Sequence, residues 1–292
     1  MIRFNSISDL VTLAEERQQP LSAVIRDYEI QRSLQPAQEI TDKMSDSLRV
    51  MREAIAAGLT NREKSASGLT GGDAGLLIRR LDAERSLGGS AMSRAAAYAL
   101  AVSEVNACMG RIVACPTAGS CGILPGALIA VGESLHSSDE EILSALFTAA
   151  GIGMVIAENA SISGAQGGCQ AECGSAAAMA AGALVELAGG NAAQVSEALA
   201  MALKSTLGLV CDPVAGLVEV PCVKRNAFGA VQAVLAADMA LAGIKSAIPA
   251  DEVIDAMHKI GLALPTSLKE TSQAGLAKTP TAVMIEKRLY NQ

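Results

Sequence analysis

Residues 174–190 read GSAAAMAAGALVELAGG, and this stretch decides the fold class. Alanine and glycine dominate it, and their small side chains let neighbouring backbones pack closely. It is shorter than the roughly 20 residues that a membrane span needs, and it contains Glu186. The other strongly apolar run, LSALFTAAGIGMVIA at 143–157, is also too short. Both runs therefore predict buried helices in the core of a globular protein.

The composition allows a large core that is built mainly from small and aliphatic side chains. Half of the 292 residues are hydrophobic, yet the chain has no tryptophan, three phenylalanines and three tyrosines. The net charge of −7 argues against nucleic-acid binding, because phosphate backbones are bound by clustered lysine and arginine. The first residues, MIRFNSISDLVTLAEERQQ, are charged and amphipathic and lack the apolar core of a secretory signal. We expect a cytoplasmic protein that binds neither nucleic acid nor membrane.

Helical periodicity runs through nearly every long segment, and no run alternates in the manner of a strand. We therefore expect an all-α fold, as a compact Ala/Gly-rich helical domain whose Gly/Pro-rich loops carry the site. Cap residues and prolines predict helices at 36–57 (ending at Gly58), 138–160, 191–206 and 249–261, and Ser267 with Glu270 predicts a further helix start. The more charged residues 1–60 are expected to form a peripheral helical layer of the same domain, and residues 61–292 its core.

Three glycine-rich breaks interrupt the helical pattern, at 115–126, 161–174 and 207–226. Loops that break a helical scaffold commonly present binding groups. The first break, CPTAGSCGILPG, offers hydroxyl groups and accessible amides at Thr117, Gly119 and Ser120. A helix is expected to start after it, and such a start suits a substrate carboxylate. An ordinary turn between helices would show the same residue types.

The second break lies in ENASISGAQGGCQAECGS, residues 158–175. Ser161 and Ser163 make it polar, and its glycines turn it tightly. Near its end, Cys169 is expected at the start of a helix, and Cys173 follows one turn further along the same face. A buried turn with two inert thiols remains an alternative, since free cysteine often serves as a small hydrophobic residue.

The third break holds VCDPVAGLVEVPC, residues 210–222, in which prolines restrict the backbone next to Cys211 and Cys222. Asn226 is the expected N-cap of a following helix that runs to about Leu241. Both cysteines are thus expected on non-helical backbone beside spare N–H groups, which is the environment that a thiolate–iron cluster needs. No common metal-ligand spacing is present, so spacing alone leaves the role of the cysteines open.

These breaks together resemble the alpha chain of the bacterial iron–sulfur L-serine dehydratases of the two-subunit type. The resemblance runs from about Ser90 to the C-terminus. It rests on four segments in the same order: CPTAGSCGILPG, NASISGAQGGCQAECGSAAAMAAG, LGLVCDPVAGLVEVPCVKRNA and GLAKTPTA.

The resemblance implies a lyase of amino-acid catabolism that converts L-serine to pyruvate and ammonia. Cys169, Cys211 and Cys222 would bind an oxygen-sensitive 4Fe–4S cluster with one open iron, and a beta subunit would complete the active site. Candidate substrate-binding residues in the matching segments are Thr117, Gly119, Ser120, Ser161, Ser163, Arg225 and Asn226. The catalytic base is not identified, and its candidates are Lys204 and Lys224. Against the pattern of single-chain relatives, no cysteine follows Cys222, and Lys204, Ser205 and Thr206 stand just before the LGLVCDP segment where those relatives tend to carry a histidine.

Two other functions are compatible with parts of the sequence. A pyridoxal phosphate dehydratase would catalyse the same net reaction, but it needs a Schiff-base lysine beside a phosphate loop, and only GAQGGCQ resembles such a loop. A non-catalytic helical scaffold or membrane component would leave all seven cysteines inert. An iron–sulfur enzyme is distinguished from both by iron content and by loss of activity in air.

Overall fold

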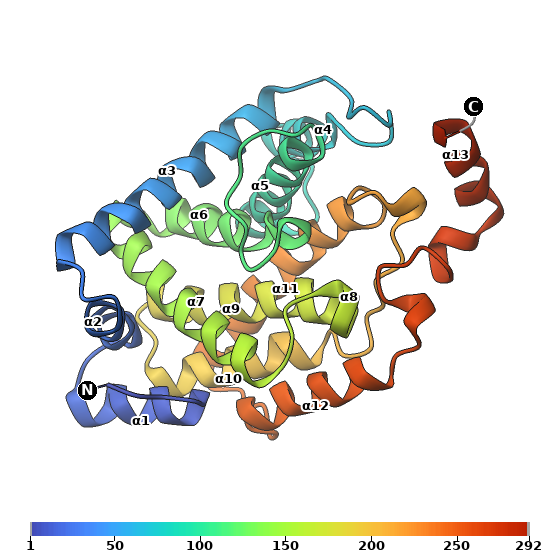
Figure 1. Ribbon diagram of the computed structural model, residues 1–292. Helices are drawn as coiled ribbons and strands as arrows, with labels where there is room; N and C mark the ends of the chain where they lie inside the picture. The colour runs from blue at the N-terminus through green and yellow to red at the C-terminus, as the bar shows by residue number, and fades with distance from the viewer. Residues whose placement is uncertain (1, 291–292) are drawn as a thin grey trace.

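The computed structural model describes residues 2–290, and thirteen α-helices make up most of it (Figure 1). Within this part of the chain no β-strand forms, and the only strand-like pairing is a single bridge between Cys211 and Lys269. The prediction of an all-α fold is confirmed. In chain order the helices are α1 Ile7–Arg17, α2 Leu21–Ser33, α3 Ala37–Thr60, α4 Asp73–Asp82, α5 Gly89–Ala107, α6 Ile123–Leu135, α7 Asp139–Asn159, α8 Gly164–Gly167, α9 Ser175–Leu187, α10 Ala192–Lys204, α11 Cys222–Leu241, α12 Ala250–Ala263 and α13 Pro280–Tyr290.

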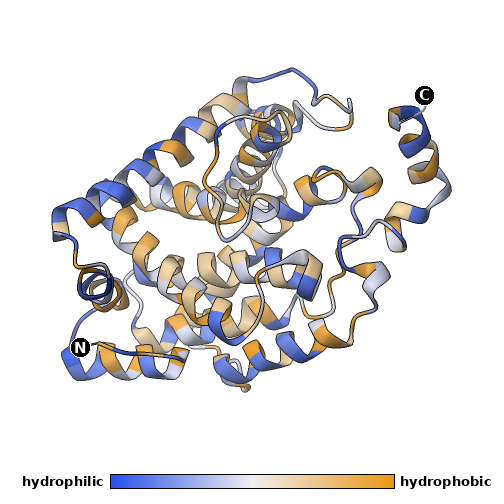
Figure 2. Cartoon of the chain, viewed as in Figure 1, coloured by the Kyte–Doolittle hydropathy of each residue, from blue (hydrophilic) through white to orange (hydrophobic). Residues whose placement is uncertain are grey.

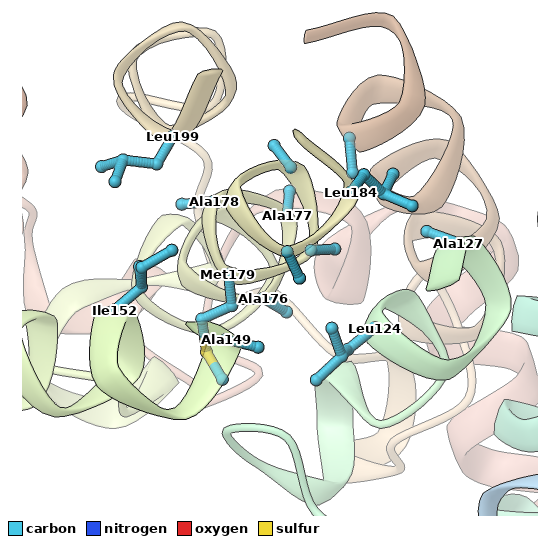
Figure 3. Close-up of a cluster of buried hydrophobic side chains, with 14 of the residues drawn as sticks. Leu124, Ala127, Ala149, Ile152, Ala176, Ala177, Ala178, Met179, Leu184 and Leu199 are labelled. Carbon is cyan, nitrogen blue, oxygen red and sulfur yellow. The ribbon is translucent and has the colours of Figure 1, made fainter. Parts of the chain in front are cut away.

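Helix α9 lies at the centre of the core, and α6, α7, α10 and α11 pack around it. Figure 3 shows its alanines between Leu124 of α6, Ile152 of α7 and Leu199 of α10. The alanines at 176–178 have no exposed surface. Because neighbours approach this helix from several sides, every face of it needs short side chains. The prediction of a buried helix in this segment is confirmed.

Two segments are long and apolar enough to cross a membrane if only length and composition are considered. They are Ala118–Leu135, which contains α6, and Asp139–Asn159, which is α7. Inside the fold, 67% of the first and 56% of the second is buried. Burial among other helices accounts for their apolar character, as it does for core helices of globular proteins.

Helices α1, α2 and α3 lie along one side of the molecule (Figure 1). Hydrophilic and hydrophobic residues alternate along α3, as the blue and orange bands in Figure 2 show. Ile7, Ile25 and Met51 belong to the same hydrophobic cluster as Ile152 of α7. These helices therefore share one core with the rest of the chain, and the boundary at residue 60 stays a prediction.

Helix signals were reliable where a side chain caps the backbone. Ser138 caps α7 and Asn191 caps α10, each in a reciprocal capping box, as predicted. Helix α3, however, continues to Thr60, so the prediction that Gly58 ends it is wrong. A Cβ on Gly58 would lie 2.2 Å from the carbonyl oxygen of Ala101 in α5. This glycine lets two helices approach closely and does not terminate one.

Three helix starts near the breaks differ from the prediction. Helix α11 begins at Cys222, and the Asn226 side chain donates to the Cys222 carbonyl oxygen at 2.9 Å inside the helix instead of capping its start. Cys222 therefore lies on helical backbone. No α-helix begins at Ser267, since residues 266–268 form a short 3-10 turn and the Glu270 amide donates to the Cys211 carbonyl oxygen at 2.8 Å. Helix α6 begins inside the first break, at Ile123.

Candidate functional site

The three glycine-rich breaks meet at one place in the fold. Thr117 of the first break donates to Oε1 of Glu172 in the second at 2.9 Å. Asn226, the last residue of the third break, lies in α11, donates to the Gly119 carbonyl oxygen at 2.7 Å and accepts from the Gly122 amide at 2.8 Å. These contacts join segments that are 55 and more than 100 residues apart in the chain.

Gln170 fixes the second break to the start of the third break and to helix α12. Its amide nitrogen Nε2 donates to the carbonyl oxygens of Gly167 at 2.9 Å and Met257 at 3.0 Å. Its oxygen Oε1 accepts from the Gly208 amide at 2.9 Å. The side chain is completely buried, so these bonds satisfy polar groups that would otherwise be costly to bury. They hold Cys169, the preceding residue, in a fixed position.

Cys169, Cys211 and Cys222 come from three different segments and are all buried, with 2%, 4% and 8% of their surface exposed. Cys169 precedes a π-helical turn, Gln170–Gly174, that leads into α9. Cys211 lies on extended backbone whose amide donates to the Leu268 carbonyl oxygen at 2.9 Å. Cys222 is the first residue of α11. The structure thus brings together the three cysteines that the sequence singled out.

The three thiols are close enough to influence one another electrostatically. Burial, and then the negative charges of Cys169 and Glu172, raise the pKa of Cys222 to about 12. Burial and the same two groups also raise the pKa of Cys211 above its ordinary range. The pKa of Cys169 is lowered instead, first by its hydrogen bond with Cys173 and then by the nearby charge of Arg225. Cys169 is therefore the thiol that ionises most readily.

Arg225 links Cys169 to the C-terminal segment of the chain. Its guanidinium donates to the Val210 carbonyl oxygen at 2.8 Å and to Oδ1 of Asp212 at 3.0 Å. The other carboxylate oxygen of Asp212 accepts from the Leu276 amide at 2.7 Å. Gly275, in the left-handed region at φ 63°, makes this approach possible, because a Cβ there would lie 2.5 Å from Oδ2 of Asp212. The GLAKTPTA segment is thereby fixed to the cysteine loops.

The predicted hydroxyl and amide residues divide into two groups by position. Thr117 and Ser120 lie together, with their Oγ atoms 3.1 Å apart, and Thr117 contacts Glu172. Ser161 donates to Gln166 at 2.9 Å and accepts from the Ser163 amide at 3.0 Å, within the second break. Gly119 and Asn226 are bonded to each other, as described above. The Asn226 side chain is thus fully used by backbone groups.

The two lysines that the sequence offered as bases are bonded to other segments. Lys204 donates from Nζ to the carbonyl oxygen of Ser246 at 2.6 Å and to its hydroxyl at 3.1 Å. Lys224 forms an ion pair with Asp73 at the start of α4. Lys204 is half-buried and Lys224 is exposed, and the Nζ atom of each is bonded away from the three cysteines. Their catalytic role stays a prediction.

Glu172 is the site residue that sequence reasoning missed. Its carboxyl lies between the first two breaks, and a Cβ on Gly164 would lie 2.8 Å from its Oε2 and 3.0 Å from the Cys211 sulfur. Burial raises the pKa of Glu172 above the ordinary 4.5, against the Thr117 hydrogen bond, which lowers it. A glutamate between two cysteines was the available signal, because a carboxyl that becomes buried beside them needs a specific partner.

An all-α scaffold that gathers three buried cysteines, an arginine and a carboxyl defines a thiol-rich centre built on loops. The family model described as "Serine dehydratase alpha chain" matches residues 6–277. The chain therefore belongs to the serine dehydratase alpha chain family, which confirms the resemblance drawn from the four segments.

The similarity to individual relatives extends over nearly the whole chain. The "Probable L-serine dehydratase, alpha chain" of Bacillus subtilis is 52% identical over 98% of this chain and 95% of its own length. The "L-serine dehydratase, alpha chain" of Peptoniphilus asaccharolyticus is 40% identical over 97% of both chains. The "L-serine dehydratase" of Streptomyces coelicolor is 40% identical over 94% of this chain, which covers 60% of that longer protein.

Proposed function

We propose that this chain is the alpha subunit of an L-serine dehydratase, a lyase that converts L-serine to pyruvate and ammonia. The family to which the chain belongs and the names of its relatives support this activity. The single structural observation that carries it is the convergence of Cys169, Cys211 and Cys222 in buried positions on three separate segments. Such an arrangement requires a reason beyond packing, because the charge of Cys169 raises the cost of ionising both Cys211 and Cys222.

The proposed cofactor is a 4Fe–4S cluster held by these three cysteines. In residues 2–290 no three histidine, cysteine or acidic side chains converge closely enough for a single metal ion. A cluster does not need three ligands around one common metal ion, because each thiolate binds a different iron. Gly164 also fits, since any larger residue would fill the space between Cys211 and Glu172. When bound through three thiolates, a cluster supplies one open iron that acts as a Lewis acid on the substrate.

The residues of this chain have distinct tasks in the proposed reaction. Arg225 holds positive charge beside the Cys169 thiolate and keeps it ionised for ligation. Thr117 and Ser120 present hydroxyl groups next to Glu172, at the entrance of α6, where they can bind the carboxylate of serine. Ser161 and Ser163 also belong to the second break and precede Gly164 in the chain, whereas Glu172 follows it.

Glu172 is the group of this chain best placed to accept the Cα proton of serine. Its Oε1 accepts from Thr117 at 2.9 Å, and its Oε2 faces the same side of Gly164 as the Cys211 sulfur. A carboxylate whose pKa is raised by burial is a stronger base than an exposed one, which suits it to proton transfer near neutral pH. Lys204 and Lys224 are the other candidates, and either would first have to leave its present partner.

A beta subunit is the proposed partner, because the relatives that match over almost their whole length are named alpha chains. The proposed location is the cytoplasm, without association with membrane or nucleic acid. A reducing compartment suits seven cysteines that are all free in the structure.

The first test is the content of iron and acid-labile sulfide in the full chain purified without oxygen. About four of each per chain are expected for a 4Fe–4S cluster. In the complex with its beta subunit, pyruvate formation from L-serine should decay in air and return with Fe²⁺ and a reductant. If neither iron nor sulfide binds after reconstitution, or if activity is stable in air and insensitive to iron chelators, the proposed mechanism is wrong.

A further inference from the structure

Cys169 has a second sulfur beside it that the proposed function does not use. The Sγ atoms of Cys169 and Cys173 lie 3.4 Å apart, both residues are free thiols, and both are buried. The π-helical turn between them, Gln170–Gly174, places residues four apart along one face. A disulfide has an S–S length of about 2.0 Å, so the two sulfurs need to move together by only about 1.4 Å (3.4 − 2.0).

A cavity reaches one member of this pair, Cys173. It has a volume of about 500 Å³ and is lined by Cys173, Thr206, Arg225, Phe228 and Gln232, among others. Arg225 also lies beside Cys169, so the same cavity borders a positive charge next to the pair. Hydrogen peroxide, which is uncharged and little larger than water, can enter a space of this size.

We propose that Cys169 and Cys173 form an oxidative modification site, at which hydrogen peroxide makes an intrachain disulfide when Cys169 holds no cluster iron. In the first step one thiolate of the pair attacks an oxygen of the peroxide. The O–O bond breaks, a sulfenic acid forms and hydroxide leaves. In the second step the other thiol attacks the sulfenic sulfur, the S–S bond forms and water leaves. The two sulfurs lose two electrons in total, and the peroxide is reduced to two waters after one proton is taken up by hydroxide.

The disulfide protects Cys169 after a cluster has been lost. Without a neighbouring thiol, a sulfenic acid is oxidised further to sulfinic acid, which reductants do not reverse. With Cys173 at 3.4 Å, the faster outcome is a disulfide that a dithiol can reduce. This consequence rests on the proposed function, because it takes Cys169 as a cluster ligand; the disulfide itself does not depend on that assignment.

Cleavage after glutamate tests the disulfide directly, because Glu172 lies between the two cysteines. The full chain is freed of iron, reduced without oxygen, treated with an equimolar amount of hydrogen peroxide, alkylated and cleaved. The expected product is peptide 159–172 joined to peptide 173–186, minus two hydrogen atoms, and it should separate on reduction. The inference is overturned if these peptides stay unlinked, or if Cys169 is found linked to Cys211 or Cys222 instead.

A second measurement tests protection through iron uptake. After peroxide and then dithiothreitol, the wild-type chain should regain its full capacity for iron and sulfide. Cys173→Ala should lose most of that capacity and carry sulfinic acid at Cys169, whereas the control Cys121→Ala, which also removes a buried thiol, should behave as wild type. Equal recovery in Cys173→Ala and wild type overturns the protective role. A chain that never binds iron but forms the linked peptides would refute the proposed function alone.

Discussion

Replacing Asn226 by alanine separates a structural role from substrate binding at this position. The side chain is 1% exposed and makes three hydrogen bonds, with the Gly122 amide and with the carbonyl oxygens of Gly119 and Cys222. Alanine would leave the Gly122 amide and the Gly119 carbonyl without these partners inside the protein. A buried group that loses its partner costs about 1–3 kcal/mol, so we expect a total loss of about 3 kcal/mol.

The measurement is urea unfolding of the full chain, followed by fluorescence or circular dichroism. The expected result is a lower midpoint with an unchanged slope, which reports a loss of stability. Asn106→Ala is a matched control in the same region, because its one side-chain hydrogen bond, to Ala118 at 3.2 Å, is exposed. It should change the free energy of unfolding by less than about 1 kcal/mol.

Steady-state kinetics then complete the comparison in the complex with the beta subunit. If Asn226 only fixes the loops, Asn226→Ala should lower cluster content and kcat together and leave the KM for L-serine nearly unchanged in the molecules that keep a cluster. Unchanged stability together with a strongly raised KM would refute the structural argument and show that Asn226 binds substrate.

Further changes test the other groups of the site. Cys211→Ala should abolish cluster assembly and Cys108→Ala should not; equal iron contents would overturn the ligand assignment. Glu172→Gln should keep the cluster but lower kcat by about 10²-fold, as expected for the loss of a general base; an unaltered kcat would exclude that role. Burial raises the pKa of Glu172 in the folded chain above 4.5, so protonation of this carboxyl favours folding. As the pH rises above that value, the wild-type chain should therefore lose stability relative to Glu172→Gln. The urea midpoints of the two cluster-free chains measure this loss. Gly164→Ala should cost about 1–3 kcal/mol and lower iron content, because its Cβ would meet Glu172 at 2.8 Å and Cys211 at 3.0 Å; Gly88→Ala, whose Cβ would come no closer than 3.5 Å to another atom, is the control.

The fold could be predicted where the deciding interactions are local. The capping box of Ser138 and Glu141 joins residues three apart, and it is formed as expected. The alanine content of 174–190 likewise reflects burial of a single helix. Gly58 was misjudged because its role depends on Ala101 in another helix, which no local pattern shows.

The candidate site was only partly accessible for the same reason. The loops and the three cysteines could be named from residue types and from the resemblance, but the bonds that assemble them are long-range. Glu172 meets Thr117 across 55 residues, and Asn226 meets Gly119 across 107 residues. Asn226 was expected to cap a helix because asparagine commonly does so. Two of its three actual partners, Gly119 and Gly122, lie on another loop, and only the folded chain brings them within reach.

The way in which the loops are joined has a consequence for the cluster. Gln170 bonds to the Gly208 amide and the Met257 carbonyl oxygen, and Asn226 bonds to the Gly119 carbonyl oxygen and the Gly122 amide. Arg225 bonds to the Val210 carbonyl oxygen, and none of these bonds involves a thiol. The cysteine positions are therefore largely set before any metal binds, unlike small metal domains that fold only around their metal. A cluster-free chain should consequently stay helical and unfold cooperatively, and the cluster should raise the unfolding temperature by binding to a formed site. A cluster-free chain whose circular dichroism showed an unfolded protein would mean that the cluster, and not the polar bonds between the loops, assembles this site.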